Sequence, residues 1–268
     1  MATIVPDSIS FSTHHIHLGL LETDTVLSSA TGFAYERSGE FYLITNWHNV
    51  TGRDPATGDC LSATLATPDV VVAFFRDPSN PAKLAVEHLK LFGEAGKPAW
   101  FEHPTFGCKV DVVALPLPSD FQTKHRLRPI NKMDFDPQFK AEVADDAFVV
   151  GYPFSDPTDA QLPIWKRASI ATEPDVDVDQ LPKLLLDTAT RSGLSGAPVI
   201  MQRVGLHGVV SGQLTGDSMF GRIRNFLGVY SGRIGADELK AQLGIVWKAR
   251  VIDEIITGRT VGITKHEV

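Results

Sequence analysis

The chain has 268 residues and a formal net charge of −7, with 43% hydrophobic and 21% charged residues, a balance that is ordinary for a soluble globular protein. The negative charge gives no reason to expect nucleic acid or an anionic membrane as a partner. No apolar run is long enough to span a membrane, and the N-terminus has no signal-peptide pattern, so we expect a cytoplasmic protein. A chain of this size can bury a substantial core as one all-β domain.

Strand patterns fill the first half of the sequence, up to residue 119. Apolar residues alternate with polar ones, or run together, in residues 8–35, 42–47, 70–75, 84–92 and 110–115. His48 stands where the second of these runs breaks into a turn, and Asp111 lies at the head of the last one. Between them, the Gly-, Pro-, Thr- and Asp-rich residues 51–69 predict an extended loop beside His48.

Three histidines, His14, His15 and His17, lie close together near the start of the chain. In a strand His15 and His17 would share one face, but no cysteine or carboxylate follows at the spacing of metal ligands. We therefore expect a partly exposed strand here and no metal. Cys60 and Cys108 leave two interpretations open, one disulfide or two reduced thiols, and a cytosolic chain favours the thiols.

Residues 120–140 have few long apolar runs and predict a connector between two halves. The connector contains a basic cluster, Lys124, His125, Arg126 and Arg128. This cluster has two interpretations, a solvated face or a contact with a peptide or a regulator. The second half, residues 141–247, begins with a buried strand at 147–153 and continues with another at 164–172. An amphipathic helix is expected over residues 248–258.

An acidic run at residues 173–179 holds four carboxylates between alternating valines. The spacing superficially resembles that of calcium ligands, but the glycine and the terminal glutamate of an EF-hand loop are missing, so we expect a solvated turn. No phosphate-binding loop and no glycine-rich dinucleotide fingerprint occurs in the sequence. The sequence therefore predicts no metal ion and no cofactor.

The segment of residues 187–200 carries a serine between two glycines, flanked by strand-like runs. Glycine permits backbone angles that are closed to other residues, so the turn can present the Ser195 hydroxyl while its N–H groups converge on one point. Acyl transfer needs such a nucleophile and oxyanion hole, although a plain Gly/Ser/Pro turn has the same composition. A serine also needs a base and an orienting carboxylate, for which His48 and Asp111 are the upstream candidates.

In the order His48, Asp111, Ser195, the chain resembles the trypsin-like (chymotrypsin-fold) serine peptidases. The segments FYLITNWHNV, DVVALPL and SGLSGAPV look like the histidine, aspartate and serine motifs of that family. Within this family, the chain most resembles the bacterial, intracellular type of peptidase domain, which lacks the disulfides of the digestive enzymes. The resemblance implies an all-β fold: two six-stranded antiparallel β-barrels, over residues 1–119 and 141–247, with a C-terminal α-helix in a single domain.

The resemblance also implies hydrolysis of a peptide bond, with a protein or peptide as substrate. His48 would take the proton from Ser195 and return it to the leaving amine, while Asp111 would hold the imidazole in the right tautomer. The backbone N–H groups of Gly193 and Ser195 would form the oxyanion hole, each donor worth roughly 3–4 kcal/mol of barrier. Leu194 stands where zymogen-activated members have an aspartate, so activation by N-terminal insertion is not expected.

The residues that the resemblance implies for substrate binding are Ala189, Ser231, Gly232 and Arg233. Ala189 would lie at the floor of the primary pocket, and because it carries no charge a strong preference for Lys or Arg is not expected. The strand that binds the substrate backbone would carry Ser231 or Ser211, and Ser231 matches better, which makes residues 203–226 an insertion. Arg233 would either favour acidic side chains in the pocket or be an exposed loop residue.

Two hypotheses of different classes follow. The first is an active intracellular serine endopeptidase, and the second is a catalytically latent or inactive protease-like scaffold that binds a peptide or protein partner, since a fold does not dictate function. The intact set of three side chains argues for the enzyme, whereas the missing zymogen device leaves room for a latent resting state. An esterase of the α/β-hydrolase type would place the histidine after the serine, unlike His48.

Overall fold

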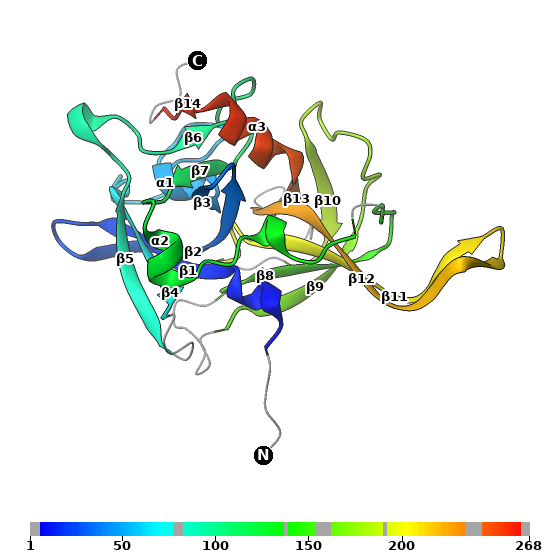
Figure 1. Cartoon of the computed structure of the whole chain (residues 1–268). Helices are drawn as coiled ribbons and strands as arrows, with labels where there is room; N and C mark the ends of the chain where they lie inside the picture. Colours follow the sequence, from blue (N-terminus) through cyan, green and yellow to red (C-terminus); the bar gives the residue numbers. More distant parts are fainter. Residues whose placement is uncertain are drawn as a thin grey trace.

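The computed structural model describes residues 6–77, 83–136, 139–153, 162–189, 192–233 and 243–263. These residues form two antiparallel β-sheets and a helix near the C-terminal end (Figure 1). The predicted fold class is therefore confirmed: the protein is mostly β, with two β units and one C-terminal helix, consistent with a chymotrypsin-like double barrel.

The first sheet has eight strands in the order β14-β6-β7-β3-β2-β1-β4-β5. They are β1 (Thr13–Leu20), β2 (Thr25–Arg37), β3 (Glu40–Thr45), β4 (Val70–Arg76), β5 (Leu84–Lys90), β6 (Phe101–Glu102), β7 (Val113–Pro116) and β14 (Thr260–Val261). The count exceeds the six expected because two-residue strands extend one edge. One of them, β14, follows the second sheet in the chain and returns to pair with β6. Among the described residues this sheet does not close into a barrel, and β14 and β5 are its two edge strands.

The second sheet is a closed barrel of six strands, in the order β10-β13-β12-β11-β8-β9, as the family resemblance implies. Its strands are β8 (Asp146–Gly151), β9 (Ile164–Ile170), β10 (Lys183–Asp187), β11 (Pro198–Val210), β12 (Gln213–Arg233) and β13 (Leu243–Lys248). The barrel holds its own apolar core, which includes Val149, Leu186 and Val199.

The predicted insertion at residues 203–226 is a β-ribbon, the outer part of the hairpin of β11 and β12. The two strands stay paired from Pro198 opposite Val229 out to Val210 opposite Gln213. The ribbon projects away from the barrel (yellow to orange in Figure 1). It carries exposed apolar side chains, Val204, Leu206, Leu214, Met219 and Phe220. Pairing of its backbone, with a register shift between His207 and Val209, therefore gives this segment its form rather than burial of its side chains.

The core that positions the site joins the two sheets. It contains Phe33 and Val112 from the first half and Val150 and Ile200 from the second. The helices are α1 (Trp47–Thr51), α2 (Phe121–His125) and α3 (Arg250–Gly258), with short 3₁₀ turns η1 (Ser8–Phe11), η2 (Glu94–Gly96) and η3 (Ile130–Lys132). The apolar side of α3 also enters this core, because its apolar residues recur on one helical face, Val251, Ile252, Ile255 and Ile256.

The strand of the three histidines is more buried than expected. β1 lies between β2 and β4 in the middle of the sheet, so His14 and His15 are each only 3% exposed. His15 and His17 share a face, as predicted, with ring centroids 4.7 Å apart. Across the described ranges, no group of three or more His, Cys, Asp or Glu side chains is placed to hold a metal ion.

The acidic run at residues 173–179 is only partly the solvated turn that we expected. The carboxylate of Asp177 accepts hydrogen bonds from Lys248 Nζ and from Arg250, each at 2.6 Å. Burial alone would raise the pKa of Asp177, but these two cations outweigh it and the pKa is lowered. The run therefore ties the segment before β10 to the end of β13 and the start of α3.

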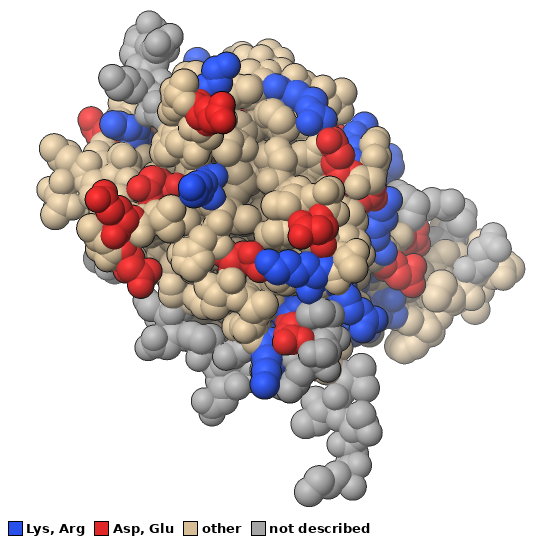
Figure 2. All heavy atoms as spheres, turned by 60° about the vertical axis from the view of Figure 1, so that its left-hand side comes forward, with Lys and Arg blue, Asp and Glu red and all other residues tan. Residues whose placement is uncertain are grey.

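Two further sequence expectations concern the thiols and membrane spans. Cys60 and Cys108 are free cysteines, so the interpretation with two thiols is the one that holds. Within the part of the chain that is described, no helix is long and apolar enough to cross a membrane. On the face shown in Figure 2, acidic and basic side chains lie next to one another.

Candidate active site

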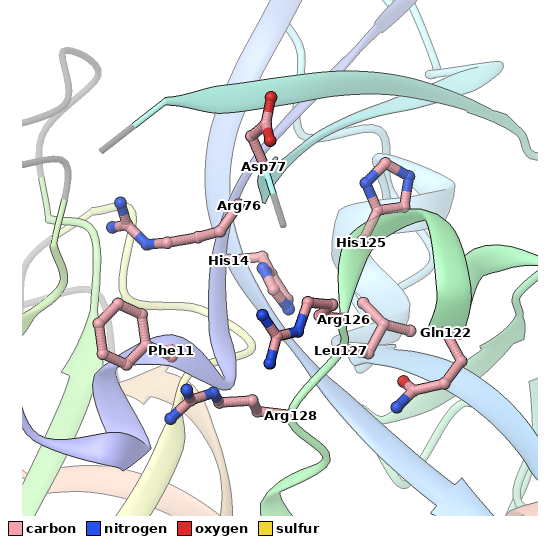
Figure 3. Close-up of a pocket in the computed structure, with 9 residues that line it drawn as sticks. All are labelled: Phe11, His14, Arg76, Asp77, Gln122, His125, Arg126, Leu127 and Arg128. Atoms are coloured by element: carbon pink, nitrogen blue, oxygen red, sulfur yellow. The ribbon is translucent and has the colours of Figure 1, made fainter. Parts of the chain in front are cut away.

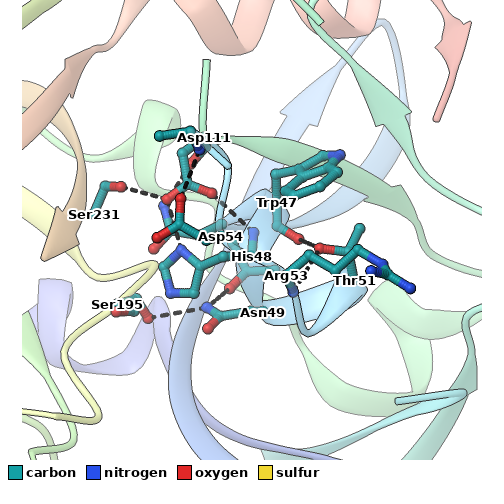
Figure 4. A network of polar contacts seen from close by, with 12 residues as sticks. Trp47, His48, Asn49, Thr51, Arg53, Asp54, Asp111, Ser195 and Ser231 are labelled. Atoms are coloured by element: carbon teal, nitrogen blue, oxygen red, sulfur yellow. Dashed lines mark hydrogen bonds and ion pairs between the residues drawn. The ribbon is translucent and has the colours of Figure 1, made fainter. Parts of the chain in front are cut away.

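The imidazole of His48 and the carboxylate of Asp111 form a close pair. Each residue flanks a strand of the first sheet, and these strands, β3 and β7, are neighbours, with Thr45 opposite Val113. His48 Nδ1 lies 2.6 Å from Asp111 Oδ2, and the His48 backbone N–H donates to Asp111 Oδ1 at 2.8 Å (Figure 4). The carboxylate is buried, with 3% of its side chain exposed. It therefore fixes both the ring and the backbone of His48.

This pair sets the proton affinity of the imidazole. Burial by itself would lower the pKa of His48, but the charge and the hydrogen bond of Asp111 outweigh it, so the pKa is raised. A carboxylate at Nδ1 also fixes the tautomer, because the Nδ1–H then donates to Asp111 and Nε2 keeps the lone pair. Nε2 of His48 is thus the ring atom that can accept a proton.

Two further groups hold Asp111, and one comes from the second sheet. The Ser231 hydroxyl, on β12, donates to Asp111 Oδ2, and Asn46 Nδ2 donates to the Asp111 carbonyl oxygen at 2.6 Å. Ser211, the other candidate for the substrate strand, lies in the turn at the tip of the β11–β12 ribbon. Of the two serines, Ser231 is the one that lies beside Asp111.

Ser195 lines the same pocket as His48, a cavity of about 270 Å³ that Ser192 and Gly193 also line. The backbone carbonyl of Ser195 accepts hydrogen bonds from the Thr31 N–H at 2.9 Å and from Asn49 Nδ2 at 3.4 Å. Between these described side chains, the Ser195 hydroxyl makes no hydrogen bond to His48. The structure therefore brings the three predicted side chains to one place, with the serine and histidine not hydrogen-bonded.

The glycines of the serine loop are required by both conformation and space. Gly193 and Gly196 have φ of +89° and +82°, angles that favour glycine. A Cβ at Gly193 would lie 2.3 Å from the Tyr152 carbonyl oxygen, and one at Gly196 would lie 2.1 Å from the Thr31 carbonyl oxygen. Gly193 and Ser195 both line the pocket, and between described residues neither N–H has an acceptor.

A polar network that the sequence reasoning missed ties the serine loop to both sheets. The Thr31 hydroxyl, on β2, donates to the Gly193 carbonyl at 2.8 Å and accepts from the Tyr152 N–H at 3.0 Å. Thr45 donates to the Thr31 carbonyl at 2.9 Å, and Asn49 Nδ2 donates to Thr45 Oγ1 at 2.9 Å. The available signal was the presence of polar residues in otherwise apolar strands, next to the motifs of His48 and Ser195.

The remaining predicted substrate residues lie less centrally. Ala189 is exposed and is not among the described residues that line the pocket of Ser195. Gly232 is half-buried, next to Ser231, and the side chain of Arg233 lies outside what the structure describes. As predicted, the loop of residues 51–69 lies beside His48, and it lines the pocket with Gly52, Leu61, Ser62, Ala66 and Pro68.

The described residues form two antiparallel β units, and two solved structures are similar to this chain. The chain is similar to the active form of the Rv3671c protease from M. tuberculosis over 96% of this chain and 84% of that chain, at 17% identity and a TM-score of 0.49. It is also similar to an inactive Rv3671c mutant, over 93% and 87%, at 18% identity and a TM-score of 0.47. No protein-family model matches the sequence, and no curated protein matches it.

Proposed function

We propose that this chain is a serine endopeptidase with His48, Asp111 and Ser195 as its catalytic residues. The observation that carries the proposal is the contact of the buried Asp111 carboxylate with His48 Nδ1. His48 and Ser195 line one pocket. A carboxylate in that position leaves Nε2 as a base facing the nucleophile's pocket. An imidazole held only for packing would not need its second nitrogen directed to a cavity with a serine.

In the proposed reaction, His48 Nε2 takes the hydroxyl proton as Ser195 Oγ attacks the peptide carbonyl carbon. The carbonyl oxygen becomes an oxyanion that the N–H groups of Gly193 and Ser195 stabilise. His48 then gives the proton to the leaving amine as the C–N bond breaks. Water then attacks the acyl carbon while His48 takes one of its protons. The ester C–O bond breaks as His48 returns that proton to Ser195 Oγ, and the carboxylic acid product is released. Asp111 stabilises the imidazolium in both steps.

The substrate is proposed to be a protein or a peptide, held along the end of β12 at Ser231 and Gly232. Ala189 would contribute no charge to the pocket for the side chain that precedes the cleaved bond, so Lys and Arg should not be strongly preferred. Arg233 would favour acidic side chains. A panel of peptides tests this specificity, because no gain in cleavage rate for Asp or Glu would contradict the part assigned to Arg233.

A latent or inactive scaffold that binds a peptide or protein partner is the second candidate. It is favoured by one observation, that the Ser195 hydroxyl and the His48 ring are not hydrogen-bonded in the described site. Catalytic hydrogen bonds are often long in unliganded enzymes and tighten when substrate binds. The choice between the two candidates therefore depends on reactivity.

The decisive experiment is reaction of the purified protein with a fluorophosphonate probe, which reacts with activated serines. The enzyme hypothesis expects labelling that is lost in Ser195→Ala and retained in Ser192→Ala. Ser192 is a matched control because it is exposed, lies in the same loop and lines the same pocket. Labelling that survives in Ser195→Ala would contradict the assignment of the nucleophile. If the wild-type protein is not labelled, the result favours the scaffold or a latent form.

A further inference from the structure

A second pocket, of about 330 Å³, opens on the first sheet and shares no lining residue with the pocket of Ser195. It lies where η1, the end of β4 and the segment after α2 come together (Figure 3). The residues of this pocket that matter here are Phe11, His14, Arg76, Asp77, Arg126 and Arg128. Its volume is at the lower end of the range for sites that take small molecules.

The pocket is positively charged in a protein whose net charge is −7. Three guanidinium groups and one carboxylate line it, which leaves an excess of two positive charges. The two histidines of the lining add no charge at neutral pH, because burial lowers the pKa of His14 to about 3 and also lowers that of His125. The pocket therefore suits a ligand with two negative charges.

Two of the three arginines are held in place before any ligand binds. Arg76 and Arg128 both lie over the ring of Phe11, with their guanidinium carbons 5.5 and 4.9 Å from its centroid. Two side chains stacked on one ring in this way lose less freedom when they bind an anion. Arg126 is the C-cap of α2 at φ +47°, a common way for a helix to end, and its exposed side chain lines the same pocket.

The back of the pocket carries an unsatisfied polar atom. His14 is 3% exposed, and its Nε2 has no hydrogen-bond partner although the ring lines the cavity. A hydrogen bond to the Phe74 backbone opposes the effect of burial on the pKa of His14, as a carbonyl acceptor does. That bond falls to Nδ1, so Nε2 of the neutral ring carries the lone pair. A buried acceptor of this kind calls for a donor, and the hydroxyl of a molecule bound in the cavity can supply it.

We propose that this pocket binds a small phosphate monoester that carries a hydroxyl group. A phosphate monoester has close to two negative charges at neutral pH, which matches the excess charge of the lining, and guanidinium groups bind its oxygens with paired hydrogen bonds. The hydroxyl donates to His14 Nε2. The proposal does not depend on the proposed peptidase function, since no residue of the Ser195 pocket takes part.

Calorimetric titration of the full chain with glycerol 3-phosphate at low salt tests the site. We expect saturable binding with a dissociation constant of about 1 mM or tighter, roughly −4 kcal/mol by the standard conversion. Arg126→Gln and Arg128→Gln should each weaken it roughly tenfold or more, as loss of a charged hydrogen-bond donor does. Both side chains are exposed, so the variants should fold. Lys97→Gln is the matched control, because it removes an exposed cation outside the pocket and should leave binding unchanged.

Three outcomes would overturn the proposal. They are no saturable binding, equal weakening by Lys97→Gln, and undiminished binding in the Arg126→Gln, Arg128→Gln double variant. Inorganic phosphate should bind more weakly than glycerol 3-phosphate, and His14→Leu should remove that difference; equal affinities in the wild-type protein would overturn the role of the hydroxyl. Binding to vesicles that contain phosphatidate, without binding of glycerol 3-phosphate, would assign the site to a lipid headgroup and overturn the small ligand.

Discussion

His48 and His14 are both largely buried in the first half of the molecule, and each lines a pocket, yet their pKa values move in opposite directions. Burial lowers the pKa of both rings. At His48 the adjoining Asp111 carboxylate outweighs burial and raises the pKa. At His14 no carboxylate opposes burial; the Arg76 guanidinium and, when it is protonated, the His125 ring add to the effect of burial, and the pKa falls to about 3. The comparison teaches that a carboxylate in contact with the ring, rather than the extent of burial, decides the direction of the pKa shift. The direction of the shift in turn decides whether a buried histidine can serve as a base.

The two pockets also differ in what supports them. The pocket of Ser195 draws on both sheets, because Thr31 on β2 bonds to Gly193 and Ser231 on β12 bonds to Asp111. The pocket of His14 is lined by η1, β1, the end of β4, and α2 with the segment after it, all of which precede the second barrel. The proposed chemistry therefore depends on the junction of the sheets, whereas the proposed anion site depends on the first half.

The largest effect should come from removing the carboxylate that distinguishes the two histidines. We expect Asp111→Asn to lower the rate of fluorophosphonate labelling on the order of 10⁴-fold, the loss known for a wrongly held tautomer. The acid limb of the pH–rate profile should also move to lower pH, because the group that raises the pKa of His48 is gone. Labelling rates from pH 5 to 9 measure both. An unchanged profile would contradict the role of Asp111.

A second prediction concerns stability against acid. The folded state keeps His14 neutral down to about pH 3, whereas the unfolded state takes up a proton below its ordinary value near 6.5. Stability is therefore lost as the pH falls from about 6.5 to about 3, by up to about 1.4 kcal/mol per pH unit. His14→Leu should lose stability less steeply in this window, as urea unfolding at several pH values would show. Equal slopes in the two proteins would be inconsistent with a neutral buried His14.

The sign is opposite for His48. Because its folded pKa is raised, its pairing with Asp111 stabilises the protein fully below pH of about 6.5 and less as the pH rises through the folded pKa. The Asp111→Asn variant should therefore lack this alkaline loss. Urea unfolding of the Asp111→Asn variant and of the wild type above pH 7 measures this difference. It also provides a control for the His14 measurement, because the expected sign is opposite.

The third prediction tests the bond between the sheets. Thr31→Val keeps the shape of the side chain but removes a buried hydroxyl with two partners, the Gly193 carbonyl and the Tyr152 N–H. We expect a loss of about 2 kcal/mol in the free energy of unfolding, together with slower labelling of Ser195. Thr25→Val, on the exposed end of the same strand, is the control. A stability equal to that of the wild type would show that the hydroxyl does not hold the loop.

The smallest effect should come from Ser231→Ala. Asp111 then loses one hydrogen bond but keeps those to the His48 ring and backbone, so we expect labelling to slow by about tenfold or less, the worth of roughly one hydrogen bond. Ser211→Ala, at the tip of the ribbon, should have no effect. Slowing by Ser211→Ala comparable to that by Ser231→Ala would reverse the choice between the two serines.

Much of the fold and of the candidate site could be predicted because the signals are local. His48 lies where an apolar strand ends, Asp111 lies before the next strand, and the glycines around Ser195 permit a turn that other residues do not. The sequence pattern predicts an insertion at residues 203–226 but not a strand pair, because the exposed apolar residues of this ribbon have no burial to impose a clear alternation.

The features that the sequence does not predict depend on contacts between residues that are far apart in the chain. The Thr31 hydroxyl bonds to Gly193, 162 residues away, and a single threonine in a strand gives no sign of such a partner. The burial of His14 follows from the central place of β1 in the sheet, which strand periodicity alone does not give. The pocket around it collects arginines from two separate segments, and the sequence pattern indicates only the basic cluster of residues 124–128, at the end of α2.

The return of β14 to the first sheet has a consequence for how the protein is made. Thr260 and Val261 pair with β6, and the Gly262 N–H donates to the Trp100 carbonyl at 3.0 Å. A ribosome delivers the chain from its N-terminal end, so the earlier half emerges first but receives this outer strand only after the later half has been translated. The sheet that carries His48 and Asp111 thus gains its edge strand β14 only after the segment with Ser195 has been translated.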